Sequence, residues 1–217
     1  MSVKRIPTAN QKIVSVNDAM GVKGIGKQQG TTRIIYDSVK LNTSANSTTV
    51  TLFKDCKTRQ YPYTNLSENK LQVGESIAMQ RFSIFILEVA AGTNNPLGTL
   101  PLAYFPAFSR LYRSDMNFNI AQNQVIKQLP LHSMYAPFNH KSKFYGESQF
   151  QPAGGDLNSF QIPQDVYEFD NPIIIPPQIE FYSEIIIPAV TVPAGFDFYL
   201  MMNIEGLGSL FSPKSNY

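Results

Sequence analysis

The sequence predicts an all-β protein built as an antiparallel β-sandwich. Alternation is strict in residues 196–205, which predicts a strand with one buried face. The apolar members of that face are Phe196, Phe198, Leu200, Met202 and Ile204. Two β-branched runs, 173–175 and 185–187, are bounded by prolines, which end strands or lie at sheet edges. Because the chain shows neither strand–helix alternation nor an internal repeat, we expect a single jelly roll with long loops and an extended N-terminal arm.

Two further strand candidates, residues 31–37 and 48–53, lie on either side of a turn rich in Asn, Ser and Thr. We expect them to form a hairpin. In the apolar segment 77–89 the apolar phase changes between Met79 and Phe82. This change predicts a β-bulge, with a short helix as the alternative.

Apolar residues also alternate with Asp and Asn over residues 115–120, which predicts another strand, with residues 124–131 as its partner. Residues 92–113 are rich in Pro, Gly and aromatic side chains, and we expect a long loop that packs on the domain. Residues 132–170 contain several Gly and Pro breakers and are expected to be mostly loop. A connection of that length is typical of a functional or surface-covering segment.

The chain has 217 residues, enough for one β-domain with a core that needs no disulfide or metal. We expect residues 1–30 to form a flexible basic arm and residues 31–217 to form the sandwich. Residues 1–35 contain six basic side chains and one acidic one, although the net charge of the whole chain is only +2. Charged residues make up 16% of the chain, so the surface is expected to be neutral and polar or partly covered by neighbours.

The single cysteine, Cys56, rules out an intrachain disulfide, and we expect a buried or idle thiol. The first eleven residues lack the apolar segment of a signal peptide, and no apolar stretch reaches the roughly 18 residues that span a membrane. The sequence therefore predicts synthesis in a cytoplasm.

Residues 21–27 have the spacing of a phosphate-binding loop. Gln28, however, stands where a Ser or Thr hydroxyl would bind magnesium, and no strand–loop–helix pattern surrounds the motif. We interpret this segment as part of the glycine-rich basic arm.

Other chemical motifs are also incomplete. His132 and His140 have no local partner at zinc-ligand spacing, and no nucleophile motif of the form Gly-x-Ser-x-Gly is present. Asp165, Glu168 and Asp170 lie close together without the spacing of a calcium loop. We expect a solvated acidic loop or, alternatively, a contact with the basic arm of a neighbouring copy. The sequence predicts no enzyme, no cofactor, no metal and no small-molecule substrate, and a hydrolase is disfavoured because no acid–base pair can be picked out.

Two segments of the chain carry a resemblance to a known family: residues 59–75, together with the apolar run 77–89, and residues 192–200. They resemble capsid proteins of tailless icosahedral bacteriophages. The resemblance implies a jelly-roll shell protein that forms capsomers, with its N-terminal arm toward neighbours or the capsid interior. Because 217 residues is short for a double jelly roll, a single barrel or a minor shell component is the implied form.

The hypothesis is therefore a virion structural protein, made in a host cytoplasm, that self-associates as a capsid subunit. Its partners would be copies of itself and other virion proteins, with weak genome or inner-membrane contact through the arm. The alternative is a receptor- or carbohydrate-binding sandwich of spike or adhesin type, although the absence of Trp counts against sugar stacking. The predicted subunit contacts are Lys4, Arg5 and Lys12 in the arm, Tyr104, Phe105, Phe108, Tyr112, Tyr135 and Phe138 in aromatic loops, and Tyr199 and Met201 on the last strand. For the loop aromatics, a place in the core is the other interpretation.

Overall fold

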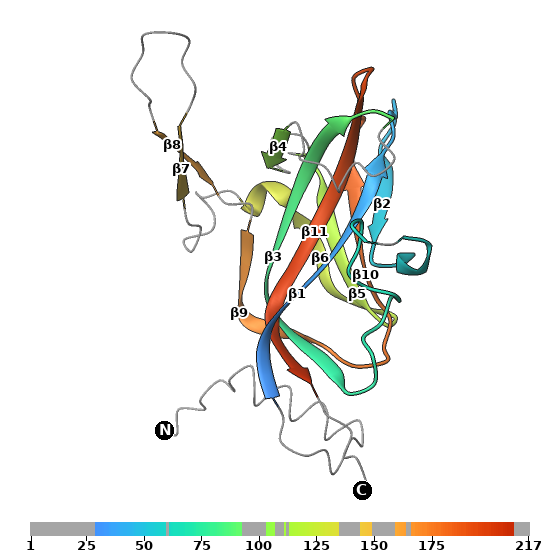
Figure 1. The fold of residues 1–217 in the computed structure, drawn as a ribbon, viewed down its shortest axis with the longest axis vertical. Coiled ribbons are helices and arrows are strands. Elements are labelled where there is room, and N and C mark those ends of the chain that lie inside the picture. The colour runs from blue at the N-terminus through green and yellow to red at the C-terminus, as the bar shows by residue number, and fades with distance from the viewer. Residues whose placement is uncertain are drawn as a thin grey trace, which may run out of the picture.

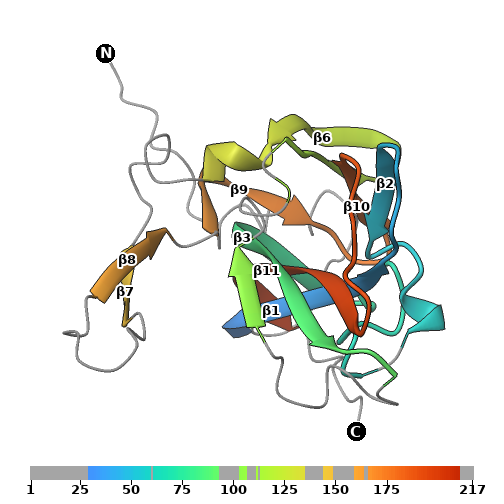
Figure 2. The same ribbon diagram turned by 90° about the horizontal axis from the view of Figure 1, so that it is seen from above.

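The protein is an all-β sandwich of two antiparallel sheets packed face to face (Figure 1, Figure 2). The computed structural model describes residues 29–59, 61–92, 103–106, 111, 113–134, 144–148, 159–163 and 166–210. The predicted fold class is therefore confirmed at the level of an antiparallel β-sandwich.

The larger sheet has the strand order β1-β11-β3-β4, and β9 also pairs with β3. Its strands are β1 (Gln29–Leu41), β3 (Glu75–Ala90), β4 (Ala103–Pro106), β9 (Val166–Ile175) and β11 (Phe196–Leu210). β9 pairs with β3 at residues 77–83, and β4 pairs with it at residues 85–88, so the two short partners follow one another along β3.

The smaller sheet has the order β2-β10-β5-β6. Its strands are β2 (Thr48–Leu52), β5 (Asp115–Ile120), β6 (Asn123–Pro130) and β10 (Phe181–Ile187). Short 3-10 turns are present at η1 (Cys56–Thr58) and η3 (Leu131–Met134). β7 (Phe144–Ser148) and β8 (Ser159–Pro163) pair only with each other, and Figure 1 shows this hairpin beside the sandwich, apart from both sheets.

Eight strands remain when β4 and the β7–β8 hairpin are set aside. In chain order, they pair from the two ends of the series toward its middle. The first pairs with the last (β1 with β11), the second with the seventh (β2 with β10) and the third with the sixth (β3 with β9). The two middle strands, β5 and β6, pair with each other. The chain thus follows the path of one long hairpin wrapped into two sheets.

The predicted hairpin between residues 31–37 and 48–53 is wrong. Both segments are strands, but β1 pairs with β11 in the larger sheet and β2 pairs with β10 in the smaller one. The polar turn between them carries the chain from one sheet to the other, and Ser44 forms an isolated bridge there with Val190. Local turn signals do not reveal that the hydrogen-bond partners of both strands lie near the far end of the chain.

The predicted bulge is confirmed. β3 is one continuous strand, and its register against β11 shifts between Met79 and Arg81, which leaves Gln80 as the extra residue. The register against β9 shifts at the same place, where the unpaired residues of β9 lie between Glu168 and Ile173. The strand at residues 115–120 and its partner are also confirmed as β5 and β6. Residues 132–170 were expected to be mostly loop, and the described residues of this range belong to η3, β7, β8 and the first half of β9.

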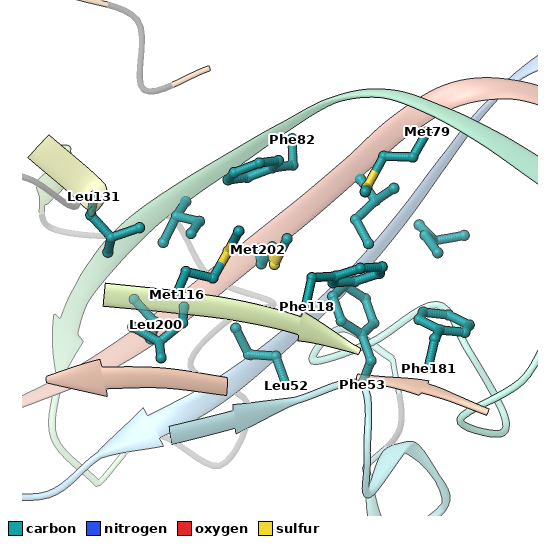
Figure 3. Close-up of a cluster of buried hydrophobic side chains, with 14 of the residues drawn as sticks. Leu52, Phe53, Met79, Phe82, Met116, Phe118, Leu131, Phe181, Leu200 and Met202 are labelled. Carbon is teal, nitrogen blue, oxygen red and sulfur yellow. The ribbon is translucent and has the colours of Figure 1, made fainter. Parts of the chain in front are cut away.

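A single hydrophobic core fills the space between the sheets (Figure 3). The predicted inner face of the last strand is confirmed, since Phe198, Leu200, Met202 and Ile204 are buried and Phe196 is half-buried. On the side of the smaller sheet the core contains an aromatic cluster in which the ring of Phe181 lies 5.6 Å from that of Phe53 and 6.2 Å from that of Phe118.

Candidate interaction surface

The outer face of the larger sheet is the candidate interaction surface, because charged and apolar side chains lie side by side on it. The antiparallel register places residues of β1, β11 and β3 opposite one another in rows. One row contains Ile34, Glu205 and Arg81, and another row contains Met201 and Phe85. Ile34 is 50% exposed, whereas Met201 and Phe85 are half-buried.

The charged part of this surface depends on the bulge in β3. The extra residue, Gln80, lets Arg81 lie opposite Glu205 on the outer face, and the register shifts immediately afterwards at Gly206. The Arg81 guanidinium donates two hydrogen bonds to the Glu205 carboxylate. A second carboxylate, that of Glu168 on β9, lies 4.0 Å from the same guanidinium.

Two adjoining hollows surround Arg81. The smaller has a volume of about 200 Å³, and the carboxamide oxygen of Asn203, which lines it, is buried without a hydrogen-bond partner among the described residues. The larger, which we call the charged hollow, has a volume of about 500 Å³. Its wall comprises Thr32, Gln80, Arg81, Glu168, Phe169, Asp170, Pro172 and Glu205. It therefore crosses the sheet from β1 to β9.

The apolar part of the surface is partly covered by the chain itself. Tyr199, predicted to face a neighbouring subunit, is only 6% exposed, because the Tyr63 ring lies 5.7 Å from its own. Burial, and next the proximity of Tyr63, raises the pKa of the Tyr199 hydroxyl. The outward position of Tyr199 is thus occupied within the subunit, and Met201 beside it remains half-buried.

The open edge of β1 is covered by the segment around Thr64. Asp37 and Thr64 form an isolated antiparallel bridge. The Asn65 side chain accepts a hydrogen bond from the Tyr36 amide (2.8 Å) and donates one to the Ile34 carbonyl (2.9 Å), as a neighbouring strand would. This cover protects the middle of the β1 edge, which would otherwise favour strand addition by another chain.

A buried ion pair anchors the loop that follows β2. The Asp37 carboxylate is fully buried, accepts a hydrogen bond from the Phe53 amide (2.6 Å) and is bound by two nitrogens of the Arg59 guanidinium. Cys56 lies in the same loop and is buried, as predicted. Burial, followed by the nearby Asp37 charge, raises the pKa of the Cys56 thiol to about 11, so the thiol is protonated and a poor nucleophile at neutral pH.

The structure places only some of the predicted contact residues. Lys4, Arg5, Lys12, Phe108, Tyr112, Tyr135 and Phe138 lie outside the described residues, as do His140 and the glycine-rich segment 21–27. Tyr104 and Phe105 belong to β4, where they pair with Leu87 and Ile86 of β3. Of the three acidic residues that lie close together in the sequence, Glu168 and Asp170 line the charged hollow, and Asp165 lies outside the described part of the chain.

Within the described ranges, no group of three or more His, Cys, Asp and Glu side chains is arranged to hold a metal ion. Nor does this part of the chain contain a helix with the length and apolar character needed to cross a membrane. His132, on η3, is half-buried. The hydrogen-bonded and ion-paired groups described above orient loops and strands.

Arg81, Glu205 and Asn65 were missed by reasoning from the sequence. Arg81 and Glu205 are 124 residues apart, and only the pairing of β3 with β11 joins them. One local signal was available for Arg81, since it follows the phase change that marks the bulge. No family model, curated protein or solved structure matches the chain.

Proposed function

We propose that this chain is a structural protein of a virus particle, a capsid subunit that acts by self-association and without catalysis. The observation that carries the proposal is the strand pairing from the outside inward, β1 with β11, β2 with β10, β3 with β9 and β5 with β6. A long hairpin wrapped into two four-stranded layers is the jelly-roll arrangement, which viral capsid domains use widely. The β4 strand and the β7–β8 hairpin are additions to that framework.

The outer face of the larger sheet supports the same proposal. A subunit that is surrounded by other subunits needs apolar side chains that become buried on assembly, and charged side chains that have a partner. Phe85, Leu87 and Met201 are half-buried on this face and Ile34 is half exposed, while Arg81 is already paired with Glu205. Neighbouring copies and other virion proteins are the proposed partners of this face.

The test is the mass of the purified protein over a concentration series, with electron microscopy of any large species. We expect symmetric oligomers or closed shells whose population rises with concentration. A protein that stays monomeric throughout and binds a glycan or a host receptor would instead identify the alternative module of spike or adhesin type.

Deleting residues 1–28 provides a second test, because the deletion stops just before the start of β1 at Gln29. We expect the shortened chain to keep the circular dichroism spectrum and thermal transition of a β-sandwich and to assemble poorly. Unchanged assembly would exclude a role of the arm in subunit contacts.

A further inference from the structure

The charged hollow combines an open volume with an excess of negative charge. Among the described residues of its wall, three carry carboxylates, Glu168, Asp170 and Glu205, and one, Arg81, carries a cation. The Arg81 guanidinium is committed to Glu205 by two hydrogen bonds and reaches Glu168 only at 4.0 Å. These described side chains together carry an excess of negative charge, which favours a cationic group.

The shape of the hollow favours a chain segment over a single ion. It extends across strands from Thr32 on β1 to Pro172 on β9, with a volume of about 500 Å³. Apolar surface is also present, since Phe169 and Pro172 contribute to the wall. None of the described acidic side chains forms a group of three or more that could hold a metal ion. An extended basic peptide fits both the length and the charge.

The chain itself contains such a segment. Residues 1–28 carry five basic side chains and one acidic one, a net charge of +4. Fully extended, 28 residues reach about 90 Å, which is far enough to lie on a neighbouring molecule. The basic side chains are spread along the segment, at Lys4, Arg5, Lys12, Lys23 and Lys27.

The direction of β1 favours an arm from another copy. β1 runs along the larger sheet from Gln29 to Leu41 (Figure 1). Its residue Thr32, close to the start of the strand, lines the hollow. The backbone runs past the hollow in β1, so the preceding residues of the same chain would need a chain reversal to enter it. An arm donated by a second copy has no such constraint.

We propose that the charged hollow binds the basic arm, residues 1–28, of a second copy of this chain. The inference rests on the proposed function, because it names the contact that joins neighbouring subunits. The proposed contact consists of ion pairs between lysines of the arm and the carboxylates of Glu168, Asp170 and Glu205.

The test uses the full chain and a zero-length carbodiimide, which couples a lysine amine only to a carboxylate in direct contact with it. Equal amounts of unlabelled and nitrogen-15-labelled protein are mixed, cross-linked and analysed by mass spectrometry. We expect links from Lys4, Lys12, Lys23 or Lys27 to the three carboxylates of the hollow. Mixed-isotope species should make up about half of these links, the share that random exchange between equal pools gives to intermolecular contacts.

The double variant Glu168→Lys and Asp170→Lys should reduce the yield of mixed-isotope links to Glu205 by about fivefold or more, since two exposed ion pairs are replaced by repulsion. Glu180→Lys is the matched control, an exposed acid outside the hollow, and should leave the yield unchanged. Links found only within one isotope, links to Glu180 as frequent as those to the hollow, or no effect of the double variant would overturn the inference.

The experiments distinguish a failure of the capsid proposal from a failure of the proposed arm contact. Mixed-isotope links to the hollow from a protein that forms no large species would keep the arm contact and remove the capsid function. Large symmetric species without such links would do the reverse.

Discussion

Asp37 shows how one buried carboxylate can organise a loop. It lies on the inner face of β1, opposite Met202, where an apolar residue would be expected from the alternation of its neighbours. The Phe53 amide and the Arg59 guanidinium neutralise and orient it, so the turn after β2 is fixed against the larger sheet. A buried charge is tolerated only when it is paired and hydrogen-bonded in this way.

The substitution Asp37→Asn should lower the free energy of unfolding by about 3 kcal/mol, because it leaves the partly buried Arg59 without its counter-charge. The measurement is the urea midpoint at neutral pH. Lys40→Met is the control, since it breaks the Lys40–Asp197 pair, whose lysine is 49% exposed and whose loss should cost less than about 1 kcal/mol. Equal midpoint shifts for the two variants would contradict the assigned role of Asp37.

For single residues, the sequence predicts the face of the strand on which a side chain lies better than it predicts the side chain that it contacts. The buried positions of the last strand were predictable, because a period of two needs no knowledge of the neighbouring strands. The Asp37–Arg59 pair was not, because no spacing rule joins side chains 22 residues apart across a loop. Tyr199 was placed on the correct outward face, but the ring that covers it, Tyr63, comes from a loop without periodicity.

At the scale of the strand, the bulge in β3 places the charged hollow. The extra residue, Gln80, changes which side chains face outward, and β11 accommodates it with a glycine. A Cβ atom on Gly206 would lie 1.9 Å from the Ala78 carbonyl oxygen, a backbone atom that cannot move aside. Gly206 is thus required by the close approach of the two strands at the bulge.

Gly206→Ala should therefore lower the free energy of unfolding by about 2 kcal/mol or more, as overpacking against backbone does. Thermal unfolding with a fitted enthalpy gives the value. The comparison variant is Gly195→Ala, where φ is +85° and no atom lies within 4 Å, so that only backbone strain of about 1 kcal/mol is added. A smaller loss for Gly206→Ala than for Gly195→Ala would show that the two strands separate easily at the bulge.

Strand existence was predictable from patterns, whereas strand pairing was not. The phase change in residues 77–89 revealed the bulge because it is a local property of one strand. The false hairpin arose because residues 31–37 and 48–53 are adjacent in sequence, while their partners are β11 and β10. In a chain wrapped from both ends, the nearest strand in sequence is often in the other sheet.

At the scale of the whole molecule, the two sheets share one core, so neither can lose its packing alone. Phe118 of β5 contacts Phe181 of β10, and both lie in the same buried cluster as Ile84 and Met202 of the larger sheet (Figure 3). The most distant strands in sequence, β1 and β11, also pair along the full length of β1. These contacts predict one cooperative unit.

Amide hydrogen exchange under native conditions tests this cooperativity. The slowest amides of β3 and β10 should exchange with the same free energy, because both open only in global unfolding. Phe118→Ala, which empties a fully buried position of the smaller sheet, should lower both values together by about 3–5 kcal/mol. If protection fell in β5 and β10 while the amide of Ile84 kept its value, the larger sheet would be stable without the smaller one. The sandwich would then consist of two units rather than one.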